Sequence, residues 1–110
     1  MQKRTKEKID KLAIEIAEDL HNSWWEQKKK NGFKSPLDFD KDWKPKYNEK
    51  EKAINMPKEC DIEYNCHQDM IPFNLLPPKK QEYDIEGGKT ALFSLIKKGY
   101  RIYKPKPKQK

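Results

Sequence analysis

The sequence predicts a small domain that is mostly α with minor β, an α+β fold of two antiparallel helices with short β segments and irregular loops. Two stretches with a helical period of apolar residues, one toward each end of the chain, predict the helices. A middle region rich in proline and aromatic residues lacks that period and predicts the loops and short strands. With 110 residues the chain has room for one domain, which excludes a multidomain enzyme.

The first helix is predicted from about Thr5 to Lys30. Gly32 follows its last lysines, as a residue that ends a helix should. A helix with so little apolar surface is not stable alone, so it needs a partner. Its apolar residues recur every three or four positions and share one face: Ile9, Leu12, Ala13, Ile16, Ala17, Leu20 and Trp24.

Residues 33–70 carry three prolines, five aromatic residues and many polar residues, which predicts loops with short turns or strands. A helical turn is compatible with residues 48–55, and the stretch from Cys60 to Cys66 alternates weakly, with Ile62 and Tyr64 on one face. The pattern leaves the role of segment 34–66 open. Such a long connection usually has a function or is partly disordered.

The second long helix is predicted from about Glu86 to Lys98, with Gly99 ending it. Its apolar face would contain Ala91, Leu92, Leu95 and Ile96. A separate helix of one or two turns is expected after Pro77 and Pro78, because proline is favoured in the first turn.

The net charge of +7 lies at the two ends of the chain. Residues 1–8 contribute 4 − 1 = +3 and residues 103–110 contribute +4, so residues 9–102 are neutral on balance. We therefore divide the chain into a basic N-terminal extension (1–8), one domain (9–102) and a Lys/Pro-rich tail (103–110). Nucleic acid is expected to bind only weakly, through these ends.

No stretch approaches the roughly 20 apolar residues of a membrane span, and the N-terminus has no secretory apolar run. These features predict a cytoplasmic protein that does not contact a membrane. In a reducing compartment Cys60 and Cys66 are expected to be free thiols, although one bridge between them stays open.

Other short motifs favour neither catalysis nor a metal. The Gly87-Gly88-Lys89-Thr90 run lacks the earlier glycine and the preceding strand of a phosphate-binding P-loop, so its glycines are expected to shape the start of the last helix. The cysteines and histidines lack zinc-ligand spacing. We expect no enzyme activity, no metal and no cofactor.

One stripe of the first helix has binding chemistry. His21, Trp24 and Lys28 are spaced by three and four residues, so they share a face next to Phe33. A tryptophan can stack on a base and a lysine one turn later can meet a phosphate. The alternative is that Trp24 is simply part of the core.

Several blocks of the chain resemble the RyR domain, the repeat found in ryanodine receptor channels and in small prokaryotic and viral proteins. The run from His21 through Trp24 and Lys28 to Gly32-Phe33 resembles H-x-x-W-x-x-x-R-x-x-x-G-W. Residues 70–77, Met-Ile-Pro-Phe-Asn-Leu-Leu-Pro, resemble L-V-P-Y-x-x-L-P, Tyr83-Asp84 follows at the family's spacing, and residues 92–100 resemble L-K-T-L-L-x-L-G-Y. The likeness covers roughly residues 8–102.

The resemblance implies two antiparallel helices with short β segments and a sensor of nucleotide-derived signals. By this likeness Trp24 would stack on an adenine-like ring, and Lys28 would stand at the family arginine near phosphates. His67 would lie beside the same pocket. The chain departs from the family where Lys28 replaces arginine, where Phe33 replaces tryptophan, and in a longer segment between Pro36 and His67.

The sequence therefore predicts a binding module for a nucleotide-like or other phosphorylated small molecule. The alternative is a protein interaction or scaffolding domain that binds another protein or its own copy. The predicted ligand-binding residues are Trp24, Lys28, Phe33, His21, His67 and Tyr83.

Overall fold

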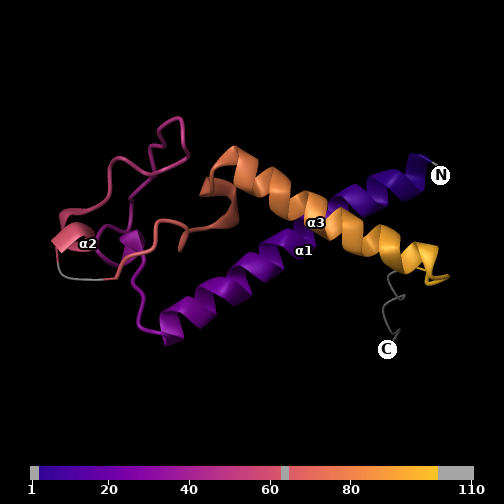
Figure 1. Ribbon diagram of the computed structural model, residues 1–110, viewed down its shortest axis with the longest axis horizontal. Coiled ribbons are helices and arrows are strands. Elements are labelled where there is room, and N and C mark those ends of the chain that lie inside the picture. Colours follow the sequence, from indigo (N-terminus) through magenta and orange to yellow (C-terminus); the bar gives the residue numbers. More distant parts are fainter. Residues whose placement is uncertain (1–2, 63–64, 102–110) are drawn as a thin grey trace, which may run out of the picture.

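The structure is a computed structural model that describes residues 3–62 and 65–101. In chain order its elements are α1 (Lys3–Lys30), a 3₁₀ turn η1 (Pro36–Asp38), α2 (Lys58–Ile62), a second 3₁₀ turn η2 (Phe73–Leu75) and α3 (Pro78–Lys97). The two long helices run in opposite directions and cross, and the loop-rich segment between them forms a lobe at one end (Figure 1).

The predicted α+β class is wrong, because the described part of the chain is helical and contains no sheet. Strand-like pairing there is limited to two isolated bridges, Lys34 with Cys66 and Tyr47 with Ala53. Side chains satisfy the backbone in place of a strand ladder: Asn48 Oδ1 accepts the Lys50 and Lys52 amides. In the weakly alternating stretch from Cys60 to Cys66, α2 covers the first residues.

The predicted first helix is confirmed. α1 begins two residues before Thr5 and ends at Lys30, followed by Gly32 with a φ of 89° that favours glycine. Ile9, Ala13, Ala17 and His21 are buried at steps of four residues, which defines the face that packs inward. Leu20, predicted on that face, is 64% exposed. Residues 3–8, which the sequence assigns to a basic N-terminal extension, are also helical and belong to α1.

The second helix is longer than predicted, because the short helix after Pro77 and the helix from Glu86 are one continuous element, α3. Gly87 and Gly88 therefore lie in the middle of this helix, and the prediction that they shape its start is wrong. Gly88 is buried where α3 crosses α1, and a Cβ there would lie 3.0 Å from the backbone oxygen of Ala13. A methyl group here would press on the Ala13 backbone, so the close approach of the two helices favours glycine at this position.

The core consists of two clusters of buried apolar side chains, and Ile85 of α3 contacts both. One cluster joins the two long helices through Ile9, Ala13 and Leu92. The other lies where the loop lobe covers the second half of α1 and contains Ala17, Trp43, Ala53, Ile71, Phe73 and Leu76. The lobe is thus fixed to the helix pair by apolar packing, although it has almost no regular structure of its own.

The cysteines are paired, so the expectation of free thiols is wrong. Cys60 of α2 and Cys66 form a disulfide, with their Cα atoms 5.1 Å apart. The sequence left this pairing open because six positions of separation fit either state. Only the backbone path decides it, by placing the two Cα atoms within the range that a disulfide spans.

Of the helices in the described residues, none combines the length and the apolar character needed to cross a membrane. The Lys/Pro-rich tail at 103–110 lies outside the described residues, as do residues 1–2, 63–64 and 102.

Candidate functional site

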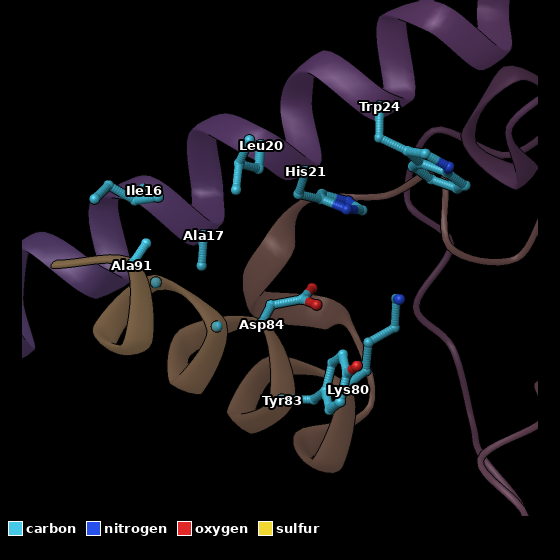
Figure 2. Close-up of a pocket in the computed structure, with 11 residues that line it drawn as sticks. Ile16, Ala17, Leu20, His21, Trp24, Lys80, Tyr83, Asp84 and Ala91 are labelled. Atoms are coloured by element: carbon cyan, nitrogen blue, oxygen red, sulfur yellow. The ribbon is translucent and has the colours of Figure 1, made fainter. Parts of the chain in front are cut away.

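A cavity of about 410 Å³ lies between α1 and α3. α1 forms one wall and α3 forms the opposite wall (Figure 2). Most of its surface is apolar, and the charged side chains at the cavity both come from α3. The residues that line it are Ile16, Ala17, Leu20, His21, Trp24, Lys80, Tyr83, Asp84, Gly87, Gly88 and Ala91.

The six predicted binding residues divide into two groups. His21, Trp24 and Tyr83 line the cavity. Lys28, Phe33 and His67 do not line it: Lys28 and His67 contact Trp24, and Phe33 contacts both of them, so Trp24 connects the two groups. Tyr83 comes from the opposite helix and is 79% exposed, so it lies at the rim.

His21 fixes the inner end of this aromatic cluster. Its side chain is buried, and its Nε2 donates a hydrogen bond of 2.6 Å to the carbonyl oxygen of Ile71. Because a carbonyl only accepts, Nε2 carries the proton. The His21 ring stacks on Trp24 with centroids 5.5 Å apart and an interplanar angle of 24°. His21 thereby ties α1 to the chain before η2 and orients Trp24.

The other contacts of Trp24 come from the loop lobe and from the end of α1. The His67 ring meets Trp24 nearly perpendicular, with centroids 4.8 Å apart. The Lys28 ammonium lies 4.6 Å from the centre of the Phe33 ring and 6.0 Å from that of Trp24, in cation–π geometry. Backbone hydrogen bonds across the Lys34–Cys66 bridge hold Phe33 near His67.

His67 is held as a neutral imidazole at pH 7. Burial lowers its pKa from the usual 6.5, and the positive charges of Lys28 and Lys80 lower it further, against an opposing contribution from Asp69. The amide of Asp69 donates to His67 Nδ1 at 3.2 Å, so the proton of the neutral ring is on Nε2. The charges of Lys28 from α1 and Lys80 from α3 therefore act on the same imidazole.

The two charged residues that line the cavity, Lys80 and Asp84, were not among the predicted binding residues. Both are half-buried on α3 and both extend from that helix toward α1, with Lys80 reaching toward Trp24 and Asp84 lying below His21 (Figure 2). The signal that could have found them is the spacing of Lys80, Asp84, Gly88 and Ala91, which places them on one helix face. It was missed because the helix was predicted to begin at Glu86.

The described residues contain no group of three or more histidine, cysteine, aspartate or glutamate side chains that could hold a metal ion. The disulfide occupies both cysteines. The chemistry of the cavity is therefore that of its apolar walls, its aromatic end and its two α3 charges.

No protein-family model matches the chain, and no curated protein or solved structure matches it either. The resemblance to the RyR domain stays a prediction from the sequence blocks.

Proposed function

We propose that the protein is a non-catalytic binding module of the RyR type, which holds a nucleotide or nucleotide-derived ligand between α1 and α3. The observation that carries the proposal is the pair of lysines near Trp24 at one end of an apolar cavity: the Lys28 ammonium lies 6.0 Å from the Trp24 ring centre, and Lys80 reaches toward Trp24 from α3 (Figure 2). Such a site combines an apolar surface for a base with positive charge for a phosphate.

The size of the cavity suits a ligand of this class. Ligand cavities usually measure roughly 300–1,000 Å³, and about 410 Å³ lies at the lower end of that range. A mononucleotide, or one half of a larger nucleotide derivative, is therefore the expected ligand.

The charge at the Trp24 end favours an anion. Lys80 lies in the first turn of α3, whose N-cap, Pro77, makes no side-chain capping hydrogen bond. Backbone amides at the start of a helix, together with the helix dipole, add to the attraction of a nearby lysine for phosphate. The sequence resemblance placed one cation here, Lys28, and Lys80 supplies a second one from the opposite helix.

A thermal-shift panel tests the proposal with AMP, ATP, ADP-ribose, cyclic ADP-ribose and cyclic dinucleotides. A ligand at 100 times its Kd stabilises the protein by about 2.7 kcal/mol, so the Tm should rise. The double variant Lys28→Ala, Lys80→Ala should lose the shift. The matched control is Lys29→Ala, Lys79→Ala, which removes the same charge from the exposed neighbours and should keep it.

A Tm that no member of the panel changes would overturn the proposal, as would an equal shift in both double variants. The exposed side chains Leu20 and Tyr83 at the cavity favour the alternative of a protein partner or a second copy. Concentration-dependent self-association in the absence of any ligand shift would support that alternative.

The predicted cytoplasmic location is part of the same proposal. The Cys60–Cys66 disulfide is evidence against a cytoplasmic location, because disulfides persist mainly in oxidising compartments.

A further inference from the structure

The polar groups of the cavity have a fixed order along its length. Trp24 and Lys80 stand at one end, His21 and Asp84 follow, and beyond them the walls are formed by small and apolar residues. This order follows from the opposite directions of the two helices. Along the cavity from the Trp24 end, the residue numbers decrease on α1 and increase on α3. A ligand that fills the cavity must therefore present an anionic group, a hydrogen-bond donor and an apolar body in that sequence.

Asp84 is the unusual member of this set. It is a half-buried carboxylate in a mainly apolar cavity, and within the described residues it makes neither a hydrogen bond nor an ion pair. Lys80, one turn earlier on the same helix, is not within ion-pair distance of it. An ionised carboxylate accepts hydrogen bonds only, so it favours a ligand with donors at this position and repels a phosphate.

Resting on the proposed function, we infer that Asp84 determines specificity by accepting hydrogen bonds from the sugar hydroxyls of the bound nucleotide. Lys80 and Asp84 are four residues apart, which is about 6 Å along the helix axis. The 5′-phosphate and the 2′- and 3′-hydroxyls of a nucleotide have a similar separation. With the phosphate at Lys80, the diol lies at Asp84 and the base extends along the apolar walls toward Ile16 and Ala91.

This role of Asp84 explains why a carboxylate is present in a site for an anion. A carboxylate next to the phosphate would weaken binding by repulsion. A carboxylate one helical turn away can instead accept hydrogen bonds from the ribose, which a lysine cannot do. At the dinucleotide-binding sites of α/β folds, carboxylates likewise accept hydrogen bonds from ribose hydroxyls. The inference predicts a ligand with a free ribose diol.

Calorimetric titration with AMP and with 2′,3′-dideoxyadenosine 5′-monophosphate tests the inference. The two probes differ only in the hydroxyls. The wild-type protein should bind AMP at least about tenfold more tightly, since hydrogen bonds to a charged group contribute roughly 1.5–3 kcal/mol. Asp84→Asn should reduce this ratio toward one, mainly by weakening AMP relative to the dideoxy compound. Glu82→Gln, which removes an exposed charge from the same helix, should keep it.

The outcomes separate the two proposals. Equal Kd values for the two probes in the wild-type protein, or the same ratio in Asp84→Asn, overturn the role of Asp84 while nucleotide binding stands. Binding of another panel nucleotide without AMP overturns the placement of phosphate and sugar. No binding of any nucleotide overturns the inference together with the proposed function. Circular dichroism of both variants checks that they fold. The ratio of the two Kd values is measured on one protein at a time, so a general loss of folded protein does not change it.

Discussion

Trp24 connects almost every polar feature of the site, and its neighbours define what it can do. His21 stacks on its ring and His67 meets it nearly perpendicular, while Lys28 is placed mainly over Phe33. These contacts leave Trp24 less free to receive a ligand ring than an isolated tryptophan would be. Its position favours the role of an end wall that keeps the imidazoles and the lysine charges close to the cavity.

His67 gives the stability of the fold a dependence on pH. Its pKa is lowered from 6.5 in the folded state, so below that pH the unfolded chain binds the proton more readily. The free energy of unfolding should therefore fall as the pH drops through 6.5 toward the folded-state pKa of His67. His67→Gln lacks this titration and should show a weaker pH dependence.

Urea unfolding of both proteins at about pH 7.5 and pH 5.5 measures the difference. Acidic groups that titrate in the same range affect both proteins alike. The difference between the two pH dependences therefore reports on His67 alone. An identical fall in stability for wild type and His67→Gln would contradict the lowered pKa.

At the scale of elements, the crossing of α1 and α3 depends on one glycine of the Gly87-Gly88 pair. Glycine inside a helix costs roughly 0.5–1 kcal/mol relative to alanine, so two in succession need a reason. For Gly88 the reason is the Ala13 backbone at 3.0 Å from an added Cβ, whereas a Cβ on Gly87 would meet nothing within 4 Å. The two residues are thus matched in helix propensity and differ in packing.

Alanine at the two positions should have opposite effects. Gly87→Ala should stabilise the protein by about 0.5–1 kcal/mol through helix propensity. Gly88→Ala should be less stable than Gly87→Ala by about 2 kcal/mol, because the helices must move apart to admit the methyl group. Chemical denaturation of both variants measures this, and equal stabilisation by the two substitutions would show that the helices do not approach so closely.

On the scale of the whole molecule, the fold is open. Its radius of gyration is 17.7 Å, against about 13 Å for a compact domain of similar length. Two long helices that cross, with the lobe packed on only one end, leave much of their surface exposed (Figure 1). A domain with so little burial gains little from its core, so a covalent constraint in the lobe matters for stability.

The Cys60–Cys66 disulfide supplies that constraint. Closing a loop of this length should stabilise the fold by about 2 kcal/mol, mainly by restricting the unfolded chain. Adding a dithiol reductant should lower the midpoint of urea unfolding for the wild-type protein. Cys60→Ala, Cys66→Ala should unfold at the reduced midpoint and should not respond to the reductant, and a wild-type midpoint that reductant leaves unchanged would refute the contribution.

Local pattern alone was enough to predict α1, because the spacing of apolar residues and Gly32 act within a few turns of the helix. It also selected His21, Trp24, Lys28 and the neighbouring Phe33, which belong to one cluster with His67 in the structure. The resemblance, and not the helical period, brought His67 into the predicted site, since 67 − 24 = 43 positions separate Trp24 from His67 along the chain.

Tertiary structure decided the features that depend on distant contacts. Residues 78–85 join α3 because α1 provides a packing partner for Ile85 and Gly88, and only that longer helix turns Lys80 and Asp84 toward the cavity. The described residues of the lobe form no sheet, because their backbone groups find turns and side chains as partners. The sequence by itself thus determined the first helix and the residue types of the site, whereas the cavity, its order of charges and the disulfide required the packed chain, since each depends on groups far apart in sequence.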